Sequence, residues 1–143
     1  MKAPLVLTFG IFTSGLSRWW PASLVIGKPP RKRVMLEPRL GGRWFEISQD
    51  ETRTVVARII VWEPPDRVVF LWQVNSSLQS DKDVKSQVDV RFEMNEGTLV
   101  ELTHDFDLMS VDTGAKLREA FQNLWPPLLG RFATRVESEA TLL

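Results

Sequence analysis

The chain contains no cysteine, and His104 is its single histidine among 143 residues. It can therefore form no disulfide or cysteine-ligated zinc site, and it has no thiol nucleophile. Asp105 and Asp107 follow His104 closely, but neighbouring residues of a strand point to opposite faces, so these side chains are not expected to converge with His104 on one metal ion. One imidazole is too few for a zinc or non-haem iron centre, so we expect no metal and no cofactor. The lack of cysteine fits a reducing cytoplasm.

Neither sign of charge predominates, since 18 Lys and Arg balance 18 Asp and Glu. Phosphate-backbone binding depends on clustered basic residues, so we expect no nucleic-acid partner. The basic run Lys28–Arg33 is broken by Pro29 and Pro30 and is interpreted as a solvated loop rather than an anion site. No apolar run reaches the ~18 residues of a membrane helix, and Met1–Phe9 lacks the layout of a signal peptide. We expect one soluble domain over residues 1–143, without membrane insertion.

Tyrosine is also absent, yet the chain carries six Trp and eight Phe. A buried aromatic ring removes about 150–250 Å² from water. These rings therefore predict either a large core or, as in many ligand sites, an aromatic-lined pocket.

Helical spacing dominates the two ends of the chain. Apolar residues from Leu5 to Phe12 predict a first short helix, and Leu16–Trp20 a second, ended by Pro21. Near the C-terminus, Asp112 or Thr113 is expected to cap a helix that ends near Asn123. A longer helix then begins near Leu124 or Trp125 with two prolines in its first turn. Its apolar stripe consists of Trp125, Leu128, Leu129, Phe132, Ala133 and Val136.

Between these helices the hydrophobic period is two. The expected strands are Lys32–Glu37, Arg43–Gln49, Thr52–Trp62, Arg67–Val74, Ser86–Met94 and Thr98–Phe106. Short turns join most of them, which predicts an antiparallel meander. The fold class is therefore α+β, with a curved sheet of about six strands around a long C-terminal helix.

Five motifs follow one another along the chain. They are Phe12–Pro21 (FTSGLSRWWP), Leu36–Trp44 (LEPRLGGRW), Trp62–Val68 (WEPPDRV), Gly97–His104 (GTLVELTH) and Leu124–Pro126 (LWP). In this order the chain resembles the SRPBCC superfamily of START and Bet v-like helix-grip proteins. Within it, the chain is similar to the branch named after the C-terminal domain of the Hsp-90 ATPase activator. Members begin with a strand before the position of Ala3-Pro4, and we expect that strand to be missing here, leaving an exposed sheet edge.

The resemblance implies a cavity between the sheet and the C-terminal helix, which holds apolar ligands in this superfamily. The residues expected to bind such a ligand are Trp19, Trp20, Trp44, Glu46, Phe70, Trp72, Phe92, His104, Trp125 and Leu129. His104 lies on the same face of its strand as Val100 and Leu102. It is either a core or rim histidine bonded to a neighbour, or a polar anchor or general base in the cavity. Glu46 lies two residues after Trp44 and therefore faces the same side of the strand. It either forms a structural ion pair with His104 or Arg43, or enters the cavity.

Three functions remain open. The first is non-catalytic binding of a small apolar or aromatic ligand. The second is interaction with an Hsp-90-type ATPase, which the family name alone suggests. The third is a small cyclase or hydrolase that uses His104 or Glu46. The expected partners are a small hydrophobic molecule, an Hsp-90-type chaperone, or a second copy that pairs through the exposed sheet edge.

Overall fold

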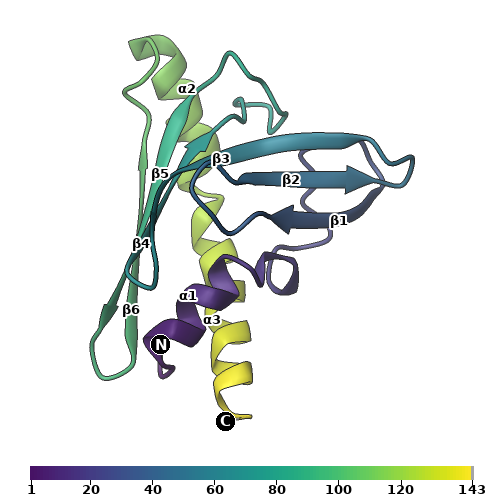
Figure 1. The fold of residues 1–143 in the computed structure, drawn as a ribbon. Coiled ribbons are helices and arrows are strands. Elements are labelled where there is room, and N and C mark those ends of the chain that lie inside the picture. The colour runs from purple at the N-terminus through teal and green to yellow at the C-terminus, as the bar shows by residue number, and fades with distance from the viewer. Residues whose placement is uncertain (143) are drawn as a thin grey trace.

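A computed structural model describes residues 1–142 of the chain. In chain order, its elements are α1 (Leu5–Phe12), the 3₁₀ turn η1 (Leu16–Arg18), β1 (Arg31–Leu36), β2 (Arg43–Ser48), β3 (Arg53–Glu63), β4 (Arg67–Trp72), β5 (Ser86–Met94), β6 (Thr98–Asp105), α2 (Val111–Gln122) and α3 (Trp125–Ala140). This is the expected α+β arrangement (Figure 1).

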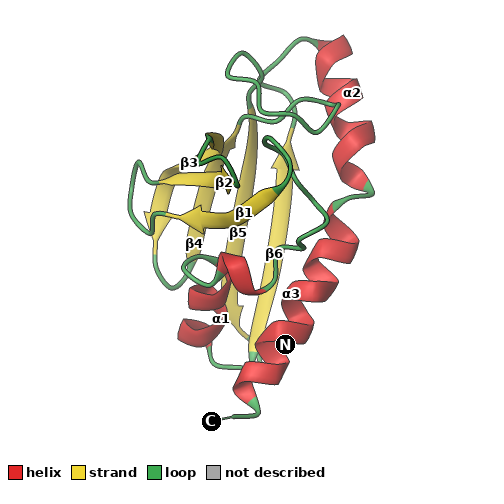
Figure 2. Cartoon of the chain, turned by 90° about the vertical axis from the view of Figure 1, so that its right-hand side faces the viewer, coloured by secondary structure: helices red, strands yellow, loops and turns green. Residues whose placement is uncertain are grey.

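The six strands form one antiparallel sheet in which neighbours in sequence are neighbours in space. Its register shifts between Arg31 and Arg33, at Trp44/Phe45 and between Ile59 and Val61. Such irregularities bend a strand and increase its twist. The sheet is accordingly strongly curved: β1 and β2 cross the direction of the longer β5 and β6, which run beside α3 (Figure 2).

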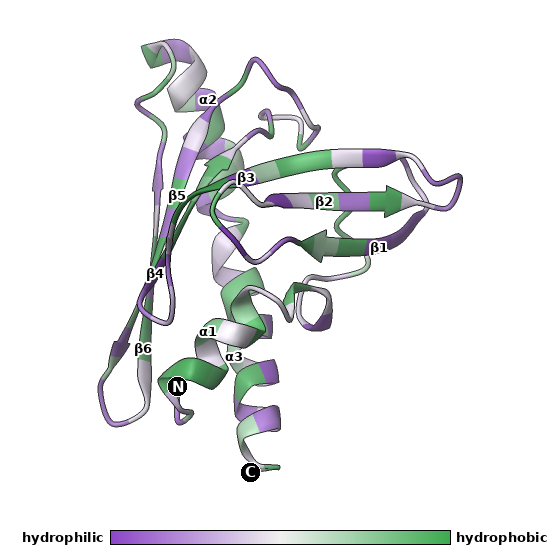
Figure 3. Ribbon diagram, in the orientation of Figure 1, coloured by the Kyte–Doolittle hydropathy of each residue, from purple (hydrophilic) through white to green (hydrophobic). Residues whose placement is uncertain are grey.

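Helix α3 packs through one apolar face. Trp125, Leu128, Phe132 and Val136 are buried at the expected spacing. Prolines occupy the first turn of α3, where a missing N–H breaks no helical hydrogen bond. Figure 3 shows hydrophobic and hydrophilic residues alternating along α3, so one side meets the core and the other is exposed.

The N-terminal residues form no strand before α1, which begins at Leu5. Met1 instead touches the start of β6: its amino group donates to the Thr98 carbonyl at 2.9 Å, and the Thr98 N–H donates to the Met1 carbonyl at 2.8 Å. The Thr98 hydroxyl donates to the Ala3 carbonyl at 2.8 Å. Strand β6 is therefore an edge strand, as the missing first strand predicts.

Two local expectations were wrong in detail. The second short helix is only the 3₁₀ turn η1. Helix α2 is capped by Ser110 rather than by Asp112 or Thr113, because the Ser110 hydroxyl accepts from the Thr113 N–H at 3.3 Å. An N-cap residue has extended backbone angles, and Ser110 has them, whereas Asp112 already lies in the first helical turn.

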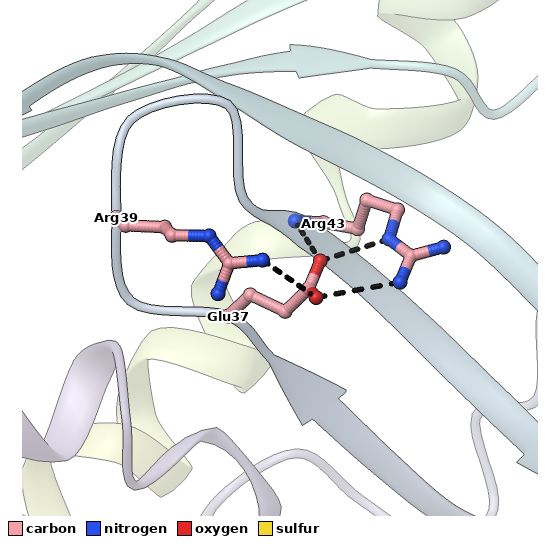
Figure 4. Close-up of polar contacts among 3 residues, drawn as sticks. All are labelled: Glu37, Arg39 and Arg43. Carbon is pink, nitrogen blue, oxygen red and sulfur yellow. Dashed lines mark hydrogen bonds and ion pairs between the residues drawn. The ribbon is translucent and has the colours of Figure 1, made fainter.

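The turn between β1 and β2 is closed by the carboxylate of Glu37 (Figure 4). It accepts from the backbone N–H of Arg43 at 2.9 Å, from the Arg43 guanidinium at 2.8 and 3.3 Å, and from Arg39 at 3.1 Å. These donors, Arg43 first, lower the pKa of Glu37 to about 2. Glu37 is thus a turn residue that engages Arg43.

Candidate functional site

Four indole rings meet between the sheet and the start of α3. Trp20 follows η1, Trp44 lies on β2, Trp72 ends β4, and Trp125 begins α3. Ring centroids are 4.9 Å apart for Trp20 and Trp44, 5.0 Å for Trp44 and Trp72, and 5.5 Å for Trp72 and Trp125. We call these residues the tryptophan cluster. At most 5% of any of them is exposed.

The indole N–H groups of the cluster differ in their partners. Trp125 donates to Nδ1 of His104 at 3.0 Å. The buried N–H groups of Trp20, Trp44 and Trp72 find no acceptor in residues 1–142. An indole nitrogen can only donate, and a buried donor left unpaired costs about 1–3 kcal/mol. Three such donors in one cluster are unusual, because most buried polar groups are hydrogen-bonded.

His104 is held in one neutral tautomer. Its Nδ1 accepts from Trp125, so the proton of the neutral ring lies on Nε2, which donates to the Ser86 hydroxyl at 2.7 Å. The ring stacks on Phe106 at 4.1 Å. Burial lowers the pKa of His104 to about 3, and the opposing attraction of Asp105 is smaller. Both ring nitrogens are thus occupied by protein partners.

We expect this buried imidazole to make stability depend on pH. The unfolded chain binds a proton at His104 near pH 6.5, whereas the folded chain does not until about pH 3. The free energy of unfolding should therefore fall as pH is lowered from about 6.5 to 4.5, by up to about 1.4 kcal/mol per pH unit. Urea unfolding at several pH values measures this slope. Carboxylates contribute mainly below this window, because they titrate near pH 4 in unfolded chains.

The matched control is His104→Gln, which cannot titrate. Its absolute stability will be lower because the bonds to Trp125 and Ser86 change, but its slope between pH 6.5 and 4.5 should be nearly flat. An equal slope in both proteins would show that another group titrates in this window.

Glu46 is a buried carboxylate with a structural role. Its oxygens accept from the backbone N–H of Ile26 at 2.9 and 3.1 Å and from that of Gly27 at 2.9 Å. It thereby fastens the loop before β1 onto β2. The partners expected from the sequence are engaged elsewhere, His104 by Ser86 and Trp125, and Arg43 by Glu37. The electrostatic partner of Glu46 is Arg31, whose pKa is lowered by burial and raised in part by Glu46.

Two more expected residues border the tryptophan cluster. The Phe70 ring is 5.4 Å from Trp44. Trp19 lies 5.8 Å from Trp20, but its N–H is already bonded to the Ile11 carbonyl at 3.1 Å. Both extend the aromatic region toward α1.

Phe92 and Leu129 are placed apart from the cluster. The Phe92 ring packs on Phe9 at 5.0 Å and on Phe12 at 5.7 Å, beneath α1. Leu129 is half-buried on α3, at the margin of the core.

Three residues of this region were not anticipated. Ser86 binds His104, while Phe106 stacks on it and Phe121 lies 5.1 Å from it. The first two could have been found from strand phase, since Phe106 is two residues beyond His104, and Ser86 shares the phase of Val88 opposite it. Phe121 lies on α2, whose packing the sequence did not specify.

The central rings contact one another, rather than lining an open hollow. Five grooves are described on residues 1–142, and Trp19 is the single expected ligand residue that lines one of them. Because the four indole rings are buried and in contact with one another, a ligand at the tryptophan cluster would have to move side chains apart. Within the same residues, no helix is long and apolar enough to cross a bilayer, and no group of three or more His, Asp or Glu is placed to hold a metal ion.

Comparison with known proteins gives matches over most of the chain. A family model described as activator of Hsp90 ATPase homolog 1-like protein matches residues 2–137. No curated protein matches. Among solved structures, the anthrahydroquino-γ-pyrone synthase Txn09, complexed with SUM, is 33% identical, with 94% of this chain and 91% of that chain covered and a TM-score of 0.60.

CalC, a self-sacrificing resistance protein from Micromonospora echinospora, is 28% identical, with 97% and 90% covered and a TM-score of 0.68. Protein NE0264 from Nitrosomonas europaea has a similar fold, with 11% identity, 97% and 90% covered, and a TM-score of 0.67. The resemblance identified in the sequence is confirmed by the family match and by the first two structures. The chain belongs to the family of activator of Hsp90 ATPase homolog 1-like proteins.

Proposed function

We propose that the chain binds a small, flat aromatic ligand at the tryptophan cluster, and that the ligand carries ring oxygens that accept hydrogen bonds. The observation that carries this proposal is the set of three buried indole N–H groups, on Trp20, Trp44 and Trp72, for which residues 1–142 supply no acceptor. A purely apolar ligand would leave these donors unpaired. A carbonyl or ether oxygen would satisfy one or more of them.

The surrounding rings suit an aromatic ligand. Within the cluster they meet mostly edge to face, with Trp44 inclined by 83° to Trp20 and by 81° to Trp72. Aromatic rings favour such edge-to-face and offset contacts, so an inserted flat ring can replace one indole contact by another. The relative that is 33% identical is named for an anthrahydroquino-γ-pyrone, a chemical class of fused rings that bear oxygens.

The polar side chains favour binding over catalysis. A general base needs a free lone pair near the reacting proton. The Nδ1 lone pair of His104 accepts from Trp125, and the Glu46 oxygens accept from two backbone N–H groups. Both groups are therefore committed to holding the fold, which supports a ligand-binding protein without a proton-transfer step.

Chromone and naphthalene form a matched pair of probes, since both have two fused six-membered rings and chromone alone carries oxygens, one in the ring and one as a carbonyl. We expect chromone to bind roughly tenfold more tightly, because one satisfied buried donor is worth about 1–3 kcal/mol. Titrations followed by tryptophan fluorescence and by calorimetry measure the two affinities.

In Trp44→Phe, which keeps a ring but loses the N–H, the preference for chromone should shrink. Without ligand, the free energy of unfolding of Trp44→Phe should fall only slightly, because an unpaired buried donor is removed together with the indole.

Trp62→Phe is the control, since Trp62 lies outside the cluster against Phe9. It should keep the preference for chromone. Equal affinity for both probes would contradict the role of the N–H groups. If neither probe bound nor raised the melting temperature, the proposal would fail, and binding to an Hsp90-type ATPase would become the candidate to test.

A second copy of the chain is a further candidate partner. Strand β6 ends the sheet, and beyond the bonds of Met1 to Thr98, no strand of residues 1–142 pairs with its outer side. Unpaired edges favour pairing with another chain. Exposed Glu101 and Asp105 lie on this edge and would repel their equivalents, so self-association should be weak at low salt and stronger at high salt. Sedimentation equilibrium measures this, and a monomer at every salt and protein concentration would contradict it.

A further inference from the structure

A groove of about 750 Å³ lies on the surface where η1 meets α3. Three arginines line it: Arg18 from η1, and Arg131 and Arg135 from α3. Arg131 and Arg135 are four residues apart and therefore share one face of the helix. The linings of the four other grooves given for residues 1–142 contain at most one arginine each.

Two of the guanidinium groups are oriented by backbone carbonyls at the end of η1 and directly after it. Nε of Arg131 donates to the Trp19 carbonyl at 3.3 Å, and Nε of Arg135 donates to the Arg18 carbonyl at 3.1 Å. These bonds use one donor of each side chain. A guanidinium has five donors in a planar fork. The terminal nitrogens of both side chains have no hydrogen-bond partner within residues 1–142, so their donors are positioned but unused.

The charges of the groove do not balance. Arg18 is paired with Glu139 at 2.7 Å. Arg131 and Arg135 have no ion-pair partner within residues 1–142, which leaves two positive charges side by side. Like charges at this spacing on a helix are mutually destabilising, so a ligand with two negative charges would relieve the repulsion.

The groove also has room and hydroxyl groups. Gly130 lies in its lining, and a Cβ there would meet nothing within 4 Å, so the space above the helix is open. Ser138 adds a hydroxyl on the same face, whereas the Thr134 hydroxyl already donates to the Gly130 carbonyl at 3.0 Å. A hydroxyl can donate to an oxyanion at little steric cost.

We propose that this groove binds the phosphate group of a soluble small molecule. A phosphate dianion matches the two uncompensated charges, and its oxygens can accept in parallel from the forked donors of arginine. The proposal does not rest on the aromatic ligand, because the groove is at the surface and Trp19 is the one aromatic residue in its lining.

The test titrates the full chain with inorganic phosphate, pyrophosphate and glycerol 3-phosphate at constant ionic strength, with chloride as the reference. We expect saturable shifts of the backbone amides of Gly130, Thr134 and Ser138, and a rise in melting temperature. In the double variant Arg131→Gln and Arg135→Gln, affinity should fall roughly tenfold or more, because charge-assisted hydrogen bonds are lost.

The matched control is the double variant Arg58→Gln and Lys116→Gln, which removes two exposed positive charges from β3 and α2. It should bind phosphate as the unmodified chain does. An equal loss in the control, or shifts that never saturate, would show unspecific screening and overturn the proposal. Binding only to vesicles that contain phosphatidic acid would assign the groove to a lipid headgroup and overturn the soluble ligand. Melting curves without phosphate show whether each variant is folded.

Discussion

Replacement of Glu46 by Gln is expected to lower the free energy of unfolding by about 3 kcal/mol. The side chain is 1% exposed and accepts three hydrogen bonds from the N–H groups of Ile26 and Gly27. In Glu46→Gln an NH₂ group replaces one of the two oxygens. At the Oε2 position it faces the Ile26 N–H, donor against donor, and at the Oε1 position it leaves the Gly27 N–H without an acceptor. The substitution also removes the negative charge that compensates partly buried Arg31. Urea unfolding at neutral pH measures the loss.

Glu101→Gln is the control, because Glu101 is an exposed carboxylate on β6. It should change stability by less than about 0.5 kcal/mol. If Glu46→Gln were equally harmless, Glu46 would not be fastening the loop before β1. It would then be free for the role in the ligand site that strand phase alone suggested.

Trp72→Ala is expected to cost about 4 kcal/mol. Trp72 is fully buried, and its ring contacts those of Trp20, Trp44, Phe121 and Trp125. Removal of the indole leaves a cavity, and three of the four contacting rings, Trp44, Phe121 and Trp125, are held by a strand or a helix, so the cavity cannot close fully. Thermal and urea unfolding of the variant measure the loss.

The cavity should also be refillable. Dry apolar cavities of this kind bind small aromatic molecules. Free indole, at roughly 100 times its dissociation constant, should restore about 2.7 kcal/mol. Trp62→Ala removes the same side chain from a half-buried site, so it should cost less and should gain nothing from indole. Rescue of both variants would mean that indole stabilises the chain elsewhere.

Most of the fold was predictable because the spacing of the apolar residues indicates whether a segment forms a strand or a helix. The alternation from Ser86 to Met94 gave the bounds of β5, and the stripe after Trp125 gave α3 with its prolines in the first turn. Bulges were not predictable, since they depend on how strands pair rather than on the sequence of either. The cap at Ser110 was missed because several capping residues follow one another there, and backbone angles select among them.

The candidate site was predictable in composition but not in bonding. The family resemblance assigned Trp20, Trp44, Trp72 and Trp125 to one expected cavity, and the structure brings their four rings together. Which indole N–H groups have acceptors depends on contacts between segments distant in sequence, such as Trp125 with His104. For the same reason, phase could not reveal that Glu46 is bound by a loop twenty residues earlier.

The central claim is that the unpaired indole N–H groups of Trp20, Trp44 and Trp72 are donors to a ligand. The most direct measurement is a ¹⁵N-resolved NMR spectrum of the six indole N–H groups, recorded with and without saturating chromone. We predict that resonances from these three residues move downfield and exchange more slowly with solvent, while those of Trp19 and Trp125, already bonded, keep their positions. Saturation by chromone with none of the three moving in this way would contradict the account.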